Sequence, residues 1–421
     1  MSAGRAFLAQ TGPSPESLVP RYREVRALTQ QLASPLSAED QMVQSSTETS
    51  PTKWHLAHTT WFFETFLLRP HVPGYRLFDG RFPYLFNSYY KHLGGHPLRT
   101  IRGAFSRPSL AEVQDYRLHV DVAMEQFLAA ASVEQLELAE LGLQHEQQHQ
   151  ELIVTDIKHA FWMNPLRPSY RQRSAAESGS APRLSWIDFP GGKYEIGAAG
   201  GSFAFDNEGP RHPVYIPAFR LASRPVTNAE FLEFVADGGY KRPELWLSDG
   251  WDHICAAGWR AALYWEEGAE GWQVFTCGGP RALVPAEPVC HVSYYEADAF
   301  ARWAGARLAS EAEWEVAAAN AAVAGNFLES ERFHVATASS RDGLQQIFGD
   351  VWEWTASPYI AYPGYRPPTG VLGEYNGKFM CNQMVLRGGS CATPQSHIRA
   401  WYRNFFPPTA RWQFMGIRLA K

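Results

Sequence analysis

The 421-residue sequence has no long apolar run and no cluster of basic residues. No stretch approaches the roughly 18 consecutive apolar residues that a membrane-spanning helix needs. The first residues lack the apolar core of a signal peptide. A net charge of −5 without a basic segment argues against nucleic acid and anionic membranes as partners. The sequence therefore predicts a cytoplasmic protein that acts on small molecules, and it leaves the oligomeric state open.

Cysteine is also scarce. The five cysteines all lie in the second half of the chain and form no C-x-x-C pair, which is a poor framework for disulfides, so we expect reduced thiols. Aromatic residues are abundant instead, with 15 Trp, 18 Tyr and 25 Phe, and they favour irregular cores and pockets lined by rings. A chain of this length is expected to divide into two domains.

The first domain, residues 1–165, has the pattern of a helical bundle. Helices are expected at residues 15–32, 51–68, 109–131 and 132–163. Ser109 with Glu112, and Ser132 with Gln135, have the spacing of a capping box at a helix start. The long connection over residues 69–108 suggests an up-down bundle with one extended crossover.

The second domain is expected at residues 186–421, after a linker at 166–185. The segment Pro165–Arg183 is rich in Pro, Ser and Arg, which is typical of a linker. Beyond it, short apolar runs alternate with Gly, Pro and Trp. Helices are expected at residues 228–237, 294–303 and 310–319, within an irregular α+β domain. The predicted fold class is therefore α followed by α+β.

Two histidines on the fourth predicted helix indicate a metal site. His145 and His149 are four residues apart, so their side chains lie on one face. His58, in WHLAHTTWFFE, shares a face with Trp61, and packing of the second helix against the fourth would bring it beside them. Three imidazoles leave coordination positions open for catalysis. His55 is expected to point elsewhere, as a surface or capping group.

Two other interpretations of these histidines remain. They could be solvated or hydrogen-bonded side chains without a metal. HEQQH also fits the zinc-peptidase pattern H-E-x-x-H, in which Glu146 would be the general base. The extended form of that pattern needs Gly and His where this chain has Leu152 and Thr155. We expect Glu146 to support the site or to lie at the surface.

Several motifs along the chain together resemble one enzyme family. WHLAH, HEQQHQE, GDVWEWTASPY, VLRGGSC, YRNFFPP and GIRLA occur in this order and resemble the ergothioneine-biosynthesis sulfoxide synthases. The resemblance covers nearly the whole chain. It implies a DinB-like four-helix bundle followed by a formylglycine-generating-enzyme domain related to C-type lectins. It also implies a non-haem iron(II), Fe(2+), held by His58, His145 and His149.

The reaction implied by this resemblance joins a thiol to C2 of the hercynine (N-α-trimethylhistidine) imidazole, and dioxygen oxidises the sulfur to a sulfoxide. Gln148 and Asn404 match residues that contact hercynine, with Phe405 beside them. Aromatic faces suit a trimethylammonium group, which has no hydrogen-bond donor. Arg99 and Arg102 match a pair that binds the carboxylate of the thiol substrate, for which guanidinium groups are well shaped.

The chain departs from the mycobacterial members of that family at two points. Phe406 stands where they have an aspartate that contacts the amino group of γ-glutamylcysteine, so we expect cysteine to be the preferred thiol. Their C-terminal proton-donor tyrosine has no confident match, since Tyr375 aligns only loosely. We predict that Tyr89 or Tyr90, or both, supply the proton. Cys391 has no second cysteine near it, so the copper chemistry of formylglycine-generating enzymes is not expected.

Other activities fit parts of the same pattern. An ovothiol-type relative would join cysteine to C5 of histidine, and a selenoneine-type relative would use a selenium donor. A non-redox alternative is a metal-dependent, DinB-like thiol transferase or binding protein, because DinB-like bundles often hold zinc.

Overall fold

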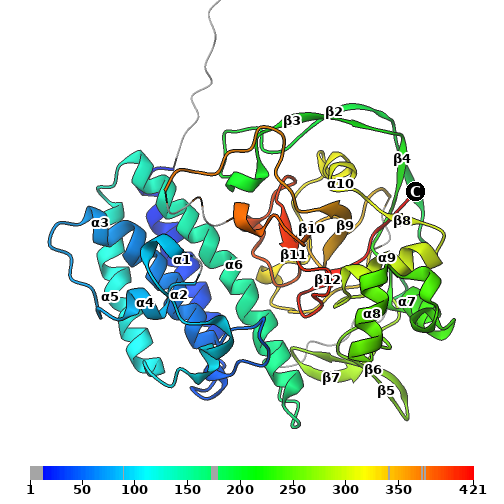
Figure 1. Cartoon of the computed structure of the whole chain (residues 1–421), viewed down its shortest axis with the longest axis horizontal. Helices are drawn as coiled ribbons and strands as arrows, with labels where there is room; N and C mark the ends of the chain where they lie inside the picture. The colour runs from blue at the N-terminus through cyan, green and yellow to red at the C-terminus, as the bar shows by residue number, and fades with distance from the viewer. Residues whose placement is uncertain (1–12, 89, 172–178, 340–341, 371–372, 374–375) are drawn as a thin grey trace, which may run out of the picture.

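A bundle of long helices forms the first part of the molecule, and small sheets with shorter helices form the second (Figure 1). The computed structural model describes residues 13–88, 90–171, 179–339, 342–370, 373 and 376–421. The bundle helices are α1 Pro15–Ala33, α2 Thr52–Phe63, α5 Leu110–Leu128 and α6 Val133–Met163. They lie where the sequence predicts helices.

Helix starts follow the local side-chain chemistry. Ser109 Oγ accepts a hydrogen bond from the backbone N–H of Glu112 (3.2 Å), and Ser132 Oγ accepts one from Gln135 (3.4 Å). These bonds satisfy N–H groups that have no partner within the helix. The predicted capping boxes of α5 and α6 are therefore present.

The second predicted helix changes its winding before it ends. After α2, residues Glu64–Leu68 form a π-helical turn that continues into α3, Arg69–His71. Such turns are frequent near functional sites. The connection that follows contains α4, Phe82–Leu85, which brings the next residue, Phe86, close to α2.

The second part contains several small sheets within the described residues. One sheet has the strand order β1-β4-β13-β8, and another has the order β11-β10-β9-β12, while β2–β3 and β5–β6–β7 form smaller sheets. The strands are β1 Trp186–Phe189, β2 Gly192–Ile196, β3 His212–Ile216, β4 Phe219–Ala222, β5 Trp265–Gly268, β6 Gly271–Thr276, β7 Gly279–Ala282, β8 Arg307–Leu308, β9 Trp352–Pro358, β10 Met384–Arg387, β11 Asn404–Phe406, β12 Met415–Gly416 and β13 Leu419–Ala420.

The second part also contains four helices of eight to ten residues within its described residues, three of them at predicted positions. α7 Asn228–Ala236, α9 Tyr294–Trp303 and α10 Glu311–Ala318 lie where the sequence predicts helices. α8, Ser248–Ala257, is an addition. Part of the predicted linker also packs against the fold, because buried Tyr170 donates a hydrogen bond to the carbonyl of Leu32 (2.6 Å).

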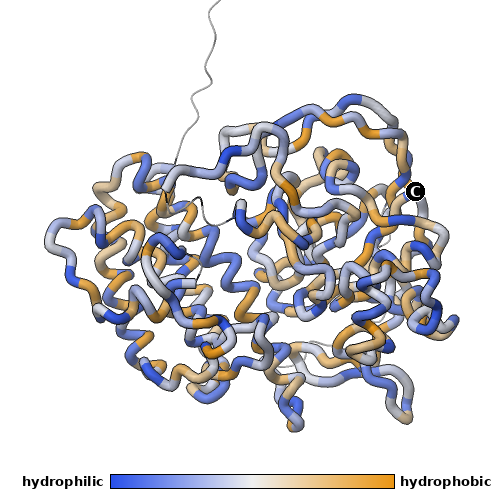
Figure 2. The backbone as a smooth tube through the Cα atoms, in the orientation of Figure 1, coloured by the Kyte–Doolittle hydropathy of each residue, from blue (hydrophilic) through white to orange (hydrophobic). Residues whose placement is uncertain are grey.

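Helix α6 belongs to both cores. Leu136, Ala139 and Leu143 are buried in the bundle core. Ile153 and Ile157, further along the same helix, are buried in the core of the second part. Between them, the helix is strongly hydrophilic where it passes between the two parts (Figure 2). The segment that carries His145 and His149 is therefore the segment where α6 leaves one core and enters the other.

A glycine brings α6 close to α2. A Cβ atom at Gly142 would lie 2.6 Å from a ring carbon of Phe63 and 2.9 Å from one of Phe62. Only a residue without a side chain permits this approach. The close contact places His58, one turn before Phe62 on α2, near His145 on α6.

No helix in the described part of the chain combines the length and the apolar character needed to cross a membrane.

Candidate metal centre

Three buried histidines converge between α2 and α6. His58, His145 and His149 each present one ring nitrogen, and these atoms lie within 4.8 Å of one another. His149 Nε2 is 3.1 Å from His145 Nε2. His58 Nδ1 lies 2.6 Å from the carbonyl oxygen of Phe86, so it donates there and its Nε2 can face the cluster. The structure thus brings together the three residues that the sequence singled out.

Burial keeps these imidazoles neutral. It lowers the pKa of His58 and His149 well below the usual value, and the neighbouring rings lower it further. Burial also lowers the pKa of His145 to about 4. Neutral imidazole is the form that binds a metal, and three such donors suit a divalent transition metal with open positions. The residues therefore fit a catalytic metal ion.

A cavity of about 250 Å³ adjoins the three histidines. It is bounded by α2 and α6 on one side and by the second part of the molecule on the other. The predicted substrate contacts all line it: Arg99, Arg102, Gln148, Asn404, Phe405 and Phe406. Two regions far apart in the sequence therefore form one pocket, as the resemblance implied.

The two predicted carboxylate-binding arginines have different surroundings. Arg102 is buried, donates to Ser50 Oγ (2.9 Å) and Ser88 Oγ (2.7 Å), and lies 3.5 Å from the centre of the Trp54 ring. Arg99 is partly exposed and pairs with Glu48, with 3.5 Å between Nη1 and Oε2. Arg102 is thus held in place, while Arg99 lies closer to the solvent.

The predicted hercynine contact Gln148 is held by residues for which the sequence predicted no role. Its Nε2 donates to Tyr402 Oη (2.8 Å), which lies 3.0 Å from His397 Nε2. His397 Nδ1 is in turn 2.6 Å from Gln144 Oε1. The motif YRNFF begins with Tyr402, so the motif itself contained a signal for this residue.

Aromatic stacking fixes the two phenylalanines of β11. Phe405 stacks on Tyr359, with 4.0 Å between the ring centres. Phe406 meets Trp412 edge to face at 5.6 Å. Both phenylalanines present rings to the cavity beside Asn404, whose Oδ1 accepts a hydrogen bond from the backbone of Phe405 (2.9 Å).

The prediction for His55 is wrong. His55 is only 2% exposed, and its Nδ1 lies 2.7 Å from His149 Nδ1. Its Nε2 lies 3.1 Å from Asp156 Oδ2. The prediction assumed that α2 has a solvent face, but every residue of α2 is buried. His55 therefore lies behind a candidate ligand rather than at the surface.

Glu146 is not at the surface either. Its carboxylate is fully buried and accepts hydrogen bonds from Arg26 (2.9 Å) and Arg117 (3.1 Å) of α1 and α5. Burial alone would raise its pKa, but the two guanidinium groups lower it below the usual value. A carboxylate paired with two arginines is unsuited to act as a general base, which argues against the peptidase interpretation.

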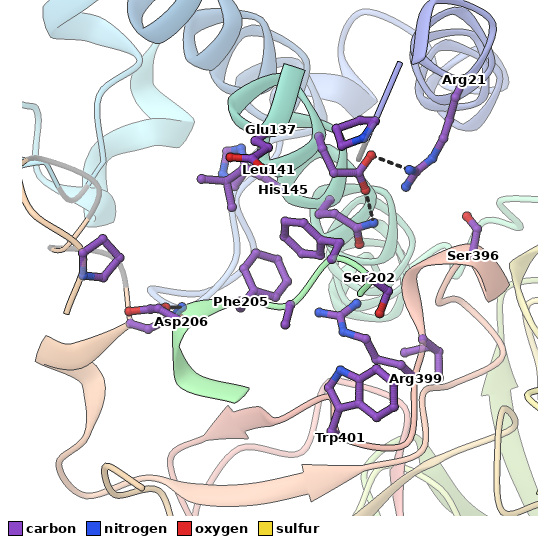
Figure 3. Close-up of a pocket in the computed structure, with 18 of the residues that line it drawn as sticks. Arg21, Glu137, Leu141, His145, Ser202, Phe205, Asp206, Ser396, Arg399 and Trp401 are labelled. Carbon is purple, nitrogen blue, oxygen red and sulfur yellow. Dashed lines mark hydrogen bonds and ion pairs between the residues drawn. The ribbon is translucent and has the colours of Figure 1, made fainter. Parts of the chain in front are cut away.

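A second cavity, of about 950 Å³, meets the first at His145 and Phe205. Figure 3 shows Glu137, Leu141 and His145 of α6 facing Ser202 and Phe205, with residues of the C-terminal region on another side. His145 therefore borders both cavities, whereas His58 and His149 border the smaller one.

Of the predicted proton donors, only Tyr90 lies within the described residues. Tyr90 is buried, packs against Trp61 and Phe66, and lines the larger cavity together with His145. Tyr89 and the loosely aligned Tyr375 lie outside the described residues. Tyr90 and the candidate ligand His145 therefore line the same cavity.

Comparison with known proteins identifies both parts. Residues 21–153 match the DinB superfamily. Residues 171–342 and 334–421 match the sulfatase-modifying factor enzyme 1-like domain. The predicted order, a DinB-like helical region followed by a domain of this type, is confirmed.

Three curated relatives carry the same description, hercynine oxygenase. The protein of Mycobacterium tuberculosis is 34% identical over 97% of this chain and 99% of its own length. That of Mycolicibacterium smegmatis is 36% identical over 66% of this chain and 70% of its own. That of Mycolicibacterium thermoresistibile is 38% identical over 52% of this chain, a match that spans about half (54%) of the relative.

Fold, site and relatives together define an oxidoreductase in which a DinB-like bundle and a sulfatase-modifying-factor-like domain enclose a candidate metal site. More narrowly, the chain belongs to the hercynine oxygenase family.

Proposed function

We propose that this protein is a non-haem iron(II)-dependent sulfoxide synthase of ergothioneine biosynthesis, which joins C2 of hercynine to the thiol of cysteine. The observation that carries the proposal is the convergence of His58, His145 and His149 on one cavity. That cavity also contains a buried arginine and aromatic faces. The hercynine oxygenase relatives support the same substrate.

The proposed reaction is balanced. Hercynine loses the hydrogen at C2, the thiol loses its hydrogen, and a C2–S bond forms. One oxygen atom of O2 becomes the sulfoxide oxygen, and the other leaves as water with the two hydrogens, so O2 accepts four electrons. Iron(II) held by the three histidines would activate O2 and favour the thiolate form of the substrate.

The remaining residues would hold the thiol of cysteine next to C2 of hercynine. Arg102, held by hydrogen bonds to Ser50 and Ser88, would bind the cysteine carboxylate, with Arg99 nearer the solvent. Gln148 and Asn404 would orient hercynine from opposite domains. Holding the thiol next to C2 makes a bimolecular step effectively unimolecular, which accounts for much of the rate gain in such sites.

Aromatic rings would receive the trimethylammonium group. Phe405 and Phe406 present rings to the cavity from β11. A quaternary cation has no N–H to donate, so its attraction to ring faces is the main specific contact available.

For the thiol, we propose cysteine because Phe406 gives no partner to the amino group of γ-glutamylcysteine. Steady-state assays should give a higher kcat/KM for cysteine than for the dipeptide. The variant Phe406→Asp should shift this ratio toward the dipeptide, whereas a parent enzyme that already prefers the dipeptide would contradict the assignment.

Tyr90, with Tyr89, is proposed to donate the proton that accompanies oxygen reduction. Positioned acids typically contribute on the order of 10²–10⁴-fold to rate. We expect Tyr90→Phe to lower sulfoxide formation and to raise oxidation of the thiol alone. If Tyr90→Phe, Tyr89→Phe and the double variant keep the parent product ratio, the proton has another source.

Oxygen uptake by the iron(II)-loaded protein tests the proposed function. We expect uptake with hercynine and cysteine together, little with either alone, and a sulfoxide conjugate of the two as the product. Uptake with histidine in place of hercynine would indicate the ovothiol-type reaction. Retention of zinc with no oxygen uptake would indicate a non-redox protein.

A further inference from the structure

A chain of hydrogen bonds connects His149 to two other residues of the cavity wall, His55 and Asp156. His149 Nδ1 lies 2.7 Å from His55 Nδ1, and His55 Nε2 lies 3.1 Å from Asp156 Oδ2. All three side chains are buried. The chain runs from a candidate ligand on α6, through α2, and back to α6 two turns further on.

The carboxylate fixes the direction of these bonds. An ionised carboxylate only accepts, so His55 Nε2 must carry the proton and donate to Asp156. In a neutral ring, His55 Nδ1 then has the lone pair and accepts from His149 Nδ1–H. This arrangement leaves the lone pair of His149 on Nε2, the nitrogen 3.1 Å from His145 Nε2.

Asp156 is held in place from both parts of the molecule. Its Oδ2 also accepts a hydrogen bond from the backbone N–H of Ser50, just before α2 (2.8 Å). Its Oδ1 accepts one from the indole N–H of Trp412, in the second part (3.2 Å). The carboxylate therefore links α2, α6 and the second domain.

We propose that His55 and Asp156 are positioning residues that fix the tautomer and orientation of His149 for metal binding, and that Trp412 couples this relay to docking of the second domain. The inference rests on the metal site in the proposed function and extends it to residues that do not touch the metal.

The contrast with His58 explains why a relay is needed. His58 donates directly to a backbone carbonyl, that of Phe86, which cannot rotate to offer a donor. His149 has a side chain as its partner, and a histidine can present either tautomer. Only the carboxylate of Asp156 removes that ambiguity. Such partners of metal-binding histidines typically change metal affinity by about 10- to 100-fold.

Metal binding, measured apart from turnover, tests the relay. Anaerobic titration of the full-length protein with Co(II), followed by its visible spectrum, gives both affinity and ligand geometry. We expect His55→Leu and Asp156→Asn each to weaken Co(II) binding by about 10- to 100-fold and to alter the spectrum. In Asp156→Asn, an NH2 group replaces one of the two carboxylate oxygens, both of which accept hydrogen bonds in the parent.

A conservative substitution separates positioning from packing. In His55→Gln, the side-chain oxygen can accept from His149 while the amide donates to Asp156, so we expect affinity to recover part of the way toward the parent. His159→Gln is the matched control on α6, because His159 bonds to Ser45 outside the relay. It should bind Co(II) like the parent.

A second pair of variants tests the coupling between domains. Trp412→Phe removes the indole donor to Asp156, and we expect a severalfold loss of Co(II) affinity. Ser396→Ala removes a different contact between domains, the 2.7 Å bond from Gln147, and should leave the affinity unchanged. Equal effects of the two substitutions would overturn the coupling.

The metal-binding results test the relay separately from the metal centre. Parent-like affinity and spectrum in His55→Leu and Asp156→Asn would overturn the relay and leave the proposed function standing. A parent protein that binds no Co(II) at these histidines would contradict the proposed metal centre itself. Destabilised variants are compared with the parent by their visible spectra at saturating Co(II). If the relay has no role, a folded variant gives the same spectrum as the parent.

Discussion

The two halves of α6 are held in different ways. In the first half, Leu143 lies in the bundle core, and Glu146 forms buried ion pairs with Arg26 and Arg117. In the second half, Ile153 lies in the core of the second domain. Glu151 accepts hydrogen bonds there from uncharged groups of Ser390, Thr393 and Trp352.

This difference shows why the site lies where it does. The first half is tied to its neighbours by charge pairs, which are costly to break once buried. The second half is tied to the second domain by neutral donors to the carboxylates of Glu151 and Asp156. His145 and His149 sit at the junction, so one helix holds the ligands rigidly against α2 and also aligns them with the substrate contacts of the second domain.

The largest effect is expected for a ligand at the junction. His149→Ala should lower metal affinity by more than about 100-fold, because loss of a ligand exceeds the loss of a supporting partner. Metal content after anaerobic reconstitution measures this. His159→Ala, further along the same helix, serves as the control and should retain metal; equal loss in both would contradict the assignment.

Next in size is removal of the charge that anchors the first half. Glu146→Leu leaves two buried guanidinium groups without their shared carboxylate, which should lower the free energy of unfolding by about 3–5 kcal/mol. Urea denaturation followed by circular dichroism measures it. The exposed Glu137, on the same half, should change stability by less than about 0.5 kcal/mol as Glu137→Gln.

Removing a core side chain from either half of α6 should lower the free energy of unfolding by a similar amount. Leu143→Ala and Ile153→Ala each remove a fully buried side chain and should cost about 2–5 kcal/mol. Because α6 is shared, we expect both to lower the midpoint of the same calorimetric transition. Two separate transitions, each sensitive to one substitution, would show that the halves unfold independently.

A smaller effect is expected where α6 approaches α2. Alanine favours a helix over glycine, yet Gly142→Ala would press on the rings of Phe62 and Phe63. We expect net destabilisation of about 1–3 kcal/mol from overpacking, with weaker Co(II) binding as His58 moves away from α6. A more stable variant with unchanged metal affinity would show that the two rings move aside while the helices keep their spacing.

The smallest effect is the pH dependence contributed by the second half. Burial raises the pKa of Glu151 above its usual value, so the folded state binds more protons than the unfolded state. Its contribution to stability is present below the unfolded pKa and is lost as pH rises through the folded pKa. Relative to the parent, Glu151→Gln should therefore gain stability between pH 4.5 and neutral pH, measured by urea denaturation. If the difference in stability between Glu151→Gln and the parent does not change with pH, the raised pKa of Glu151 is contradicted.

Residue spacing was enough to predict the helices of the bundle and the three candidate metal ligands. The four-residue spacing of His145 and His149 and the helical face of His58 led to the three-histidine cluster, and the capping boxes of α5 and α6 gave their starts. Such signals are local, since they depend only on helical periodicity and on groups three or four residues apart.

Other features depend on packing that no local pattern contains. Amphipathic reasoning assumes a solvent face, but α2 is buried on all sides, so His55 was wrongly placed at the surface. The bond between Gln148 and Tyr402 joins residues 254 positions apart. Strands such as β12 and β13 contain only two residues each, too few for alternation to reveal them.

Hercynine deuterated at C2 gives the most direct test of the central claim, that sulfur is joined to this carbon at the three-histidine site. The iron(II)-loaded protein is incubated with this substrate, cysteine and O2, and the product is analysed by mass spectrometry. We expect a sulfoxide conjugate that has lost the deuterium, and no such product from the His149→Ala variant. A conjugate that retains the deuterium, or one that forms equally well in the variant, would contradict the claim.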